Sequence, residues 1–460
     1  MSTPAAPSGR ATAALAAFAS QLELVDIPQE VIAKARLCLL DTVGCCVYGS
    51  ALPPVRTLTK MVLAEGSKPL ASLLGTPHRS APAQAALVNG TAAHAFQLDE
   101  VHSGATLHPG SVVVPAALAL AEAAGTISGA DFLVAMIAGY EVGIRVGLAT
   151  GGRMFGRGYH NQGTTGTVAA AAAAARILKL DPHATMHAMG IAASQAAGLM
   201  AVQEGANAKA FHSGRASQSG VYGALLATDG YTGIEAVLDV DYGGFYSTLV
   251  DAHDPDKLTR GLGSRWEILE VGFKSSPASN GSITAMHTLQ RIMRTHGLVA
   301  RDIGEISASV STNTLEHCGW EFDPAASKGV LAAQMNLRYG LAAMALDGVA
   351  TPAQYAQERI AGADIAAFLP KISVRASTAY DKDPALRLAC TLAVRTRSGG
   401  LHTDETLYRP GGIEDPMPPE ALEEKFMTLA SPIVSPERAA QCMAHIQSLE
   451  RAPRVAILTD

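Results

Sequence analysis

The sequence has few charged and few aromatic side chains for a chain of 460 residues. Charged residues make up 17% of the chain and aromatic residues 5%, whereas hydrophobic residues make up 48%. So small a charged fraction indicates that many helix surfaces are buried against other helices or against another subunit. The length is too great for one simple core and predicts two or three domains.

The sequence also has no cluster of one charge and no long apolar run. The formal net charge is −6 and no basic block occurs, so a nucleic-acid partner is not expected. The most apolar stretch, residues 132–148, is interrupted by Glu141 and Arg145, so no membrane span is expected. Residues 1–20 contain no long apolar core, and we do not interpret them as a secretory signal.

The six cysteines form no C-x-x-C pair, which excludes a zinc ribbon and argues against a disulfide framework. Buried thiols in a reducing compartment are the simpler interpretation, and we expect a cytoplasmic protein. Motifs of several other enzyme classes are missing too, because the chain has no His-Glu-x-x-His, no Walker loop and no Gly-x-Ser-x-Gly. The cysteines are Cys38, Cys45, Cys46, Cys318, Cys390 and Cys442.

Helical periodicity dominates the first part of the chain and returns at its end. Apolar residues recur every three to four positions, and seven consecutive alanines occupy 169–175. Asp26 is a plausible cap for the helix that begins near Pro28. The helices expected on this basis cover 30–48, 114–124 (or from 111), 130–147, 164–180, 182–199, 209–227, 418–430 and 436–451.

Strand-like alternation appears only between these two helical parts. Residues 303–312, 371–375 and 387–396 alternate apolar and polar side chains, which is typical of strands. Helices are expected at 282–296 and 331–346. We therefore predict a mainly α fold: a large all-helical domain from residues 1–265 and 409–460, with a smaller inserted α+β, lid-like domain at 266–408.

One short segment gathers much of the chemistry that the chain offers. Three histidines and two acids fall within fifteen residues, and a Pro-Gly pair follows the last histidine, which places it at a turn. Histidine titrates near neutral pH, so a bend that carries His and Asp is a candidate acid/base site. The alternative is a polar interhelical loop with a capping Asp and solvated histidines. The residues are His94, Asp99, Glu100, His102 and His108.

Four further polar positions stand out in the sequence. His160 precedes the alanine helix, Lys209 lies three residues before His212 at an expected helix start, Lys274 lies on a loop, and Tyr339 lies within an expected helix. A lysine at an apolar interface can act as a base or bind a carboxylate. For each residue alone, a solvated or core-edge side chain is the competing interpretation. No metal site is expected, because the spacing between His102 and His108 is not that of a helix-face pair.

Several segments, taken in order, carry a family resemblance over nearly the whole chain. They are Pro28-x-x-Val-Ile-x-x-Ala-x-x-x-Leu-Leu-Asp41-Thr-Val-Gly44, Asn89-Gly-Thr-Ala-Ala-His94-Ala-Phe-x-Leu-Asp99-Glu, His108-Pro-Gly-x-x-Val-x-Pro115-Ala, Gly139-Tyr-Glu-Val-Gly-Ile-Arg145, Tyr159-His160, Lys209 and Phe273-Lys274. In this order and spacing they resemble the MmgE/PrpD family, which includes 2-methylcitrate dehydratase, cis-aconitate decarboxylase and iminodisuccinate epimerase.

The resemblance implies a homodimeric enzyme that uses no cofactor and acts on a small di- or tricarboxylate. It implies a site at the junction of a helical domain and a lid-like α+β domain. Further residues expected to contact the substrate are Gln97, His102 and Ser279. The catalytic residues that the resemblance implies are His108, His160, Lys209, Lys274 and Tyr339, with Asp99 beside them.

Three positions depart from the pattern of the dehydratase- and decarboxylase-like members. Gln97 replaces an Asp, Val101 replaces a Thr, and Ser279 replaces a His that follows the lid lysine in the decarboxylase-like members. Dehydration needs an acid for the departing hydroxyl, whereas epimerisation needs only two proton-transfer groups. The sequence therefore favours an epimerase of the iminodisuccinate type. A dehydratase- or decarboxylase-like lyase is the alternative, and a non-catalytic carboxylate binder is the second.

Overall fold

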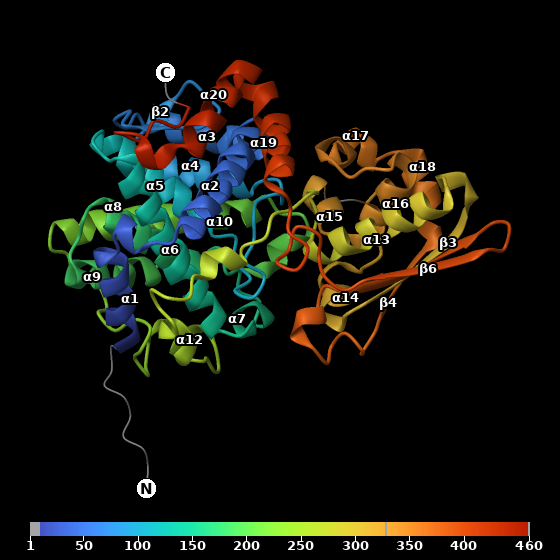
Figure 1. The fold of residues 1–460 in the computed structure, drawn as a ribbon, viewed down its shortest axis with the longest axis horizontal. Coiled ribbons are helices and arrows are strands. Elements are labelled where there is room, and N and C mark those ends of the chain that lie inside the picture. Colours follow the sequence, from blue (N-terminus) through green and yellow to red (C-terminus); the bar gives the residue numbers. More distant parts are fainter. Residues whose placement is uncertain (1–9, 327–328, 459–460) are drawn as a thin grey trace, which may run out of the picture. The chain divides into compact units, whose positions relative to one another are not determined.

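Helices dominate the computed structural model, which describes residues 10–326 and 329–458 (Figure 1). The described residues are 58% helical with few strands, so the expected mainly α fold is confirmed. Two compact units are present. The first comprises the chain up to Ala201, Asn207–Val271 and the chain from Pro418 onward, and the second comprises Val202–Ala206 and Gly272–Met417.

The alanine helix α8 (Thr165–Ile177) forms the centre of the first unit. Nearly all of its side chains are buried, and it packs against α5, α6, α9 and α10. The other helices of this unit are α1 (Arg10–Gln21), α2 (Gln29–Ser50), α3 (Pro53–Ala64), α4 (Pro82–His94), α5 (Gly110–Ala124), α6 (Gly129–Ala149), α7 (Arg153–Gly156), α9 (Pro182–Ala193), α10 (Ala208–Thr228), α11 (Phe245–Leu249), α12 (Asp256–Thr259), α19 (Pro419–Val434) and α20 (Pro436–Gln447). Strands β1 (Ala71–Ser72) and β2 (Arg79–Ser80) form a small antiparallel pair.

Small residues let these helices approach closely. A Cβ placed on Gly220 of α10 would lie 2.5 Å from both the carbonyl carbon and the Cβ of Ala170 in α8. A Cβ on Gly143 of α6 would lie 2.4 Å from the Cβ of Ala169. Both separations are shorter than van der Waals contact, so glycine is required where α6 and α10 cross α8.

Helix α6 is the one helix among the described residues that is long and apolar enough to cross a bilayer by length and composition. Its most apolar window is 94% buried inside the protein, which is also what a core helix shows. The buried face includes Glu141 and Arg145, whose side chains form an i,i+4 ion pair at 3.4 Å. The six cysteines are buried thiols, as expected.

The second unit is built around a four-stranded sheet with the order β4-β3-β5-β6. Strand β3 (Ile303–Val310) pairs parallel to β4 (Ile372–Ala376) and antiparallel to β5 (Cys390–Thr396), and β5 pairs antiparallel to β6 (Leu401–Thr406). Alternate residues of β3 and β5 are buried, and α13 packs on the sheet and against α16 (Figure 1). The helices of this unit are α13 (Asn280–His296), α14 (Thr312–Cys318), α15 (Val330–Gln334), α16 (Leu337–Asp347), α17 (Gln357–Ile360) and α18 (Ala363–Phe368).

Several expected boundaries were wrong, each for a local reason. The helix expected over 331–346 is two helices, because the chain turns at Asn336 and its side chain caps α16 through the Tyr339 N–H. The helix expected over 182–199 ends at Ala193. Asp26 does not cap α2, because Pro28 occupies the N-cap position. Strand β6 was missed, since most of its residues are polar.

A buried polar cluster lies where α2, α5 and α6 meet. The Glu100 carboxylate accepts hydrogen bonds from the Gly110 N–H (2.7 Å), the Tyr140 hydroxyl (2.7 Å) and the Thr42 hydroxyl (3.2 Å). Burial, together with the nearby carboxylates of Asp41 and Asp99, raises the pKa of Glu100 to about 8. This acid therefore remains largely protonated at neutral pH.

Replacing Gly220 by Ala should destabilise the first unit by about 1–3 kcal/mol, because the new methyl group overpacks the α8–α10 contact. Gly156→Ala is the matched control, since a Cβ at Gly156 meets nothing within 4 Å. Denaturant unfolding measures both variants. Equal stabilities would show that α8 and α10 are not packed this closely.

Replacing Glu100 by Gln should make the protein less sensitive to alkaline pH. Folded Glu100 binds its proton more tightly than the unfolded chain does, so wild-type stability falls as pH rises toward 8. The expected loss relative to the variant is up to about 1 kcal/mol per pH unit between about pH 5 and pH 8. Melting temperatures across this range measure the effect, with the exposed Glu424→Gln on α19 as control. Parallel profiles for wild type and Glu100→Gln would contradict it.

Candidate active site

The histidine-rich segment connects α4 to α5 inside the first unit. Helix α4 ends at His94, and Pro109 stands at the N-cap of α5, so His108 lies in the turn that precedes this helix. Between them, a backbone bridge joins His102 to Leu107 and closes a short loop. His108 thus lies outside a helix, as expected, and most of the segment is buried, with Gly104 exposed.

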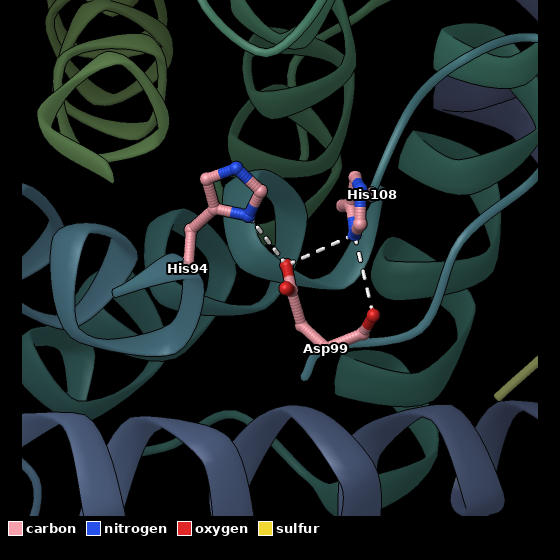
Figure 2. A group of neighbouring side chains, drawn as sticks. All are labelled: His94, Asp99 and His108. Carbon is pink, nitrogen blue, oxygen red and sulfur yellow. Dashed lines mark hydrogen bonds and ion pairs between the residues drawn. The ribbon is translucent and has the colours of Figure 1, made fainter. Parts of the chain in front are cut away.

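Asp99 lies between two imidazoles, as Figure 2 shows. One carboxylate oxygen, Oδ2, lies 2.8 Å from Nδ1 of His94 and 3.3 Å from Nδ1 of His108. The His108 Nδ1 also lies 3.2 Å from the Asp99 carbonyl oxygen. Burial alone would raise the pKa of Asp99, but the contacts with His108 and His94 outweigh it and hold the pKa well below its usual range. Asp99 is therefore a carboxylate that orients both rings.

Lys209 extends this group on the far side of His94. Its Nζ donates to the Gln97 side-chain oxygen at 2.7 Å and lies 3.3 Å from Nε2 of His94. Because His94 Nδ1 faces a carboxylate and its Nε2 faces an ammonium, the neutral ring carries its proton on Nδ1. Burial, with Lys209 contributing, lowers the pKa of His94 to about 3.

The charge on Lys209 is itself adjustable near neutral pH. Burial lowers the pKa of Lys209 to about 8, although Asp99 opposes the shift. Gln97 contacts the ammonium without neutralising it, and its backbone has a φ of 58°, a left-handed conformation that is uncommon for a residue with a side chain. The Gln97 amide also donates to the His94 carbonyl at 3.3 Å. The lysine is therefore held by a neutral acceptor on a constrained backbone.

A second pair of histidines adjoins the first. The ring centroids of His94 and His160 are 5.6 Å apart, and His160 Nδ1 lies 3.0 Å from His212 Nδ1. Burial, followed by the Lys209 charge, lowers the pKa of His160 well below its usual range. His160 and Lys209, both predicted from the sequence, thus lie in the same cluster as Asp99 and His108.

A buried ion pair fixes the backbone that carries Asp99. The Lys425 ammonium on α19 donates to the Asp41 carboxylate at 2.6 Å and to the Leu98 carbonyl at 2.7 Å. Asp41 in turn accepts from the Glu100 N–H at 2.8 Å. Burial alone would lower the pKa of Lys425, but Asp41 outweighs it and raises the pKa. The residues on both sides of Asp99 are therefore bound to one ion pair.

His108 is held independently from the other side. The Gln162 side chain accepts from the His108 N–H at 2.8 Å and donates to the His108 carbonyl at 3.1 Å. Its amide also donates to the Ser213 hydroxyl at 2.9 Å. The His108 side chain remains 14% exposed, whereas those of His94 and Asp99 are fully buried. Of the three side chains in Figure 2, His108 is thus the one that is partly exposed to solvent.

Of the other predicted residues, His102 has its own partners in the first unit, and three belong to the second unit. His102 lies 4.0 Å from both Glu267 and Glu270, and its Nδ1 accepts from the Ala105 N–H at 3.0 Å, so it helps to hold the 102–107 loop. Lys274, Ser279 and Tyr339 belong to the second unit and are buried there. Ser279 caps α13, and the Tyr339 hydroxyl donates to the Gln354 carbonyl. Their roles toward a substrate stay predictions.

The residues His94, Asp99 and His108 could also hold a metal ion, since their ligand atoms lie within 4.8 Å of one another. The same atoms, however, are hydrogen-bonded to each other. A metal ion would displace the Nδ1 proton of His94 while Lys209 faces the opposite nitrogen. The donor set therefore fits proton transfer better than metal binding.

The sequence placed His94 in the candidate acid/base segment without making it a catalytic residue, and it assigned no role to His212, Asp41 or Lys425. Both His94 and Asp41 could have been recognised from the sequence. His94 stands five residues before Asp99 at the end of a helix, and Asp41 lies in one of the segments that resemble the MmgE/PrpD family. Lys425 could not, because its partner is 384 positions away in the chain.

Comparison with known proteins agrees with the resemblance seen in the sequence. Residues 13–258 match the MmgE/PrpD N-terminal domain, and residues 277–451 match the MmgE/PrpD C-terminal domain. The chain is 32% identical to the cis-aconitate decarboxylase-like protein oryM of Aspergillus oryzae, over 99% of this chain and 98% of that protein.

Two further relatives are named cis-aconitate decarboxylase. The protein of Aspergillus terreus is 31% identical over 98% of this chain and 95% of its own length. The Homo sapiens protein is 27% identical over 95% of this chain and 91% of its own length. With both domains matched and relatives aligned over nearly the full length, the chain belongs to the MmgE/PrpD family.

Proposed function

We propose that this chain is a lyase that removes carbon dioxide from a small unsaturated tricarboxylate of the cis-aconitate type. The observation that carries the proposal is the group formed by the buried Asp99 and Lys209 with the partly exposed His108, which combines a proton-transfer imidazole with an ammonium. The names of the relatives support a decarboxylase. They give no support to the epimerase that the sequence alone favoured, and the lyase alternative replaces it.

Decarboxylation of such a substrate breaks one carbon–carboxylate bond. The electron pair spreads over the adjacent double bond onto the conjugated carboxylate, and carbon dioxide leaves. One end of this allylic system then takes one proton, so the site must supply an acid and stabilise negative charge. An imidazolium held by a carboxylate supplies the acid, and a lysine ammonium helps to stabilise the negative charge.

His108 is the proposed proton donor. Asp99 stabilises its protonated form through the contact to Nδ1 at 3.3 Å, and this side chain is partly exposed. Burial lowers the pKa of His94, so its ring is neutral, and its Nε2 contacts the Lys209 ammonium and helps to position it. Lys209 is proposed to bind a substrate carboxylate, and Lys274, Tyr339 and Ser279 remain predicted contributors from the second unit.

Proton NMR in heavy water tests the reaction with a panel of cis-aconitate, citrate, 2-methylcitrate and iminodisuccinate. We expect loss of cis-aconitate, new vinylic signals of a five-carbon diacid and one deuterium at the carbon of the allylic system that takes the proton. Release of labelled carbon dioxide from carboxyl-labelled substrate provides the second readout. Deuterium uptake with inversion and no new alkene would instead establish an epimerase, and binding without turnover a carboxylate binder.

Asp99→Asn should reduce kcat by about a hundredfold or more, because His108 loses the charge that stabilises its protonated form. The matched control is Asp229→Asn, which changes an exposed carboxyl group after α10. Circular dichroism checks that the fold is retained. A second variant, His108→Gln, changes the more exposed ring and should show a similar loss of kcat. It tests the pair even if Asp99→Asn folds poorly. Near-normal turnover in both would remove this pair from the mechanism.

Gln97→Glu should shift the alkaline limb of the pH profile of kcat/KM to higher pH. Lys209 binds a carboxylate only while protonated, so wild-type kcat/KM should fall as pH rises through about 8. A carboxylate in place of the Gln97 amide would raise the pKa of Lys209 and lower the peak kcat/KM, because it competes with the substrate. The exposed Gln195→Glu is the control. If the alkaline limb of the kcat/KM profile did not shift, the titration of Lys209 would not be the cause of the fall in kcat/KM.

A further inference from the structure

A second cluster of ligating side chains lies on the surface of the first unit, on α9. His183 and His187 are four residues apart on this helix and therefore project from the same face. Their rings are 4.5 Å apart between centroids. Glu235, from the segment after α10, points its Oε1 toward both rings, at 3.5 Å from His183 Nε2 and 4.0 Å from His187 Nε2.

The separations are close to those of a metal site. The ligand atoms of His183, His187 and Glu235 all lie within 4.8 Å of one another. A tetrahedral zinc ion with bonds of about 2.0–2.1 Å keeps its ligand atoms about 3.4 Å apart. The side chains of His183 and Glu235 are 65% and 61% exposed, so both can rotate by the small amount required.

The backbone around Gly233 prepares His187 for this role. His187 Nδ1 lies 3.3 Å from the Gly233 carbonyl oxygen and 3.2 Å from the Gly233 nitrogen. In the tautomer with the proton on Nδ1, the ring donates to that carbonyl oxygen. The lone pair of Nε2 then faces Glu235. A metal-bound histidine usually donates its other ring N–H to a carbonyl or carboxylate in this way.

The segment that presents Glu235 is fixed against the helix. A Cβ on Gly233 would lie 2.4 Å from the His187 carbonyl oxygen, and a Cβ on Gly190 would lie 2.3 Å from the Ile234 carbonyl oxygen. This direct backbone contact sets the distance between Glu235 and α9. Two of the three ligands, His187 and Glu235, thus come from backbone that packs together without intervening side chains.

The other surface-reaching cluster in the described chain is a poorer candidate. His102 lies near Glu267 and Glu270, but Arg265 already binds both carboxylates, at 2.9 and 2.8 Å. In addition, His102 Nδ1 accepts the Ala105 N–H, so the proton of the neutral ring is on the nitrogen that would have to bind the metal. At the α9 cluster, Glu235 faces the two histidines and no arginine among the described residues, and His187 Nδ1 can donate to the Gly233 carbonyl oxygen, which leaves Nε2 for the metal.

We propose that His183, His187 and Glu235 form a surface site for a divalent transition-metal ion of the zinc class. Two imidazoles and one carboxylate are the ligand types that Zn²⁺ accepts, and a single oxygen ligand would hold Mg²⁺ or Ca²⁺ poorly. Three protein ligands leave a coordination position for water or for an external ligand. The site is independent of the proposed lyase activity.

Titration calorimetry of the full chain with ZnCl₂ tests the proposal, with Co²⁺ as a visible spectroscopic probe of tetrahedral coordination. We expect one ion per chain, and a loss of affinity of at least about tenfold in His183→Ala and in Glu235→Gln. Both side chains are exposed, so neither variant should unfold. His78→Ala, at another exposed histidine, should bind the ion like the wild type.

Asp99→Asn separates this site from the histidine cluster of Figure 2 and should leave Zn²⁺ affinity unchanged. The ion should also raise the melting temperature of the wild type but not of His183→Ala. Absence of binding at millimolar Zn²⁺ would overturn the proposal. So would binding that survives both substitutions, because the ion would then lie elsewhere.

Discussion

The candidate site depends on one buried ion pair, Asp41 with Lys425. Neither charge reaches solvent freely, so each requires the other. Between them they also bind the carbonyl of Leu98 and the N–H of Glu100, the two residues that flank Asp99. The position of the Asp99 carboxylate is therefore set by backbone contacts on both sides, and the imidazoles of His94 and His108 are oriented by it in turn.

The charges in the cluster are arranged so that the Lys209 ammonium is not paired directly with a carboxylate. Asp99 is engaged by two imidazoles, and Lys209 is held by a neutral amide and a neutral ring. An acid at position 97 would form a tighter pair with Lys209 but would neutralise it. The glutamine, on a left-handed backbone at φ 58°, keeps the ammonium in place without neutralising its charge.

The sequence predicted most helices of the fold because their apolar spacing is local information. The run of alanines predicted α8, and the helical spacing of apolar residues before Tyr48 predicted α2. The break at Asn336 was missed because a capping side chain interrupts an apolar pattern without altering it. In the site, Asp99, His108, His160 and Lys209 could be found from a local motif and the family resemblance. Lys425 could not, because its role exists only once distant segments meet.

That distance along the chain has a consequence for synthesis. Lys425 leaves the ribosome long after Asp41, with the whole of Gly272–Met417 made in between. Until then the emerging helices hold an acid with no cation, and the segment around Asp99 has only one of its two supports. The first unit therefore cannot finish folding in the order in which it is translated. Its last folding step requires α19, so the candidate cluster around Asp99 is completed only late, after most of the chain has been synthesised.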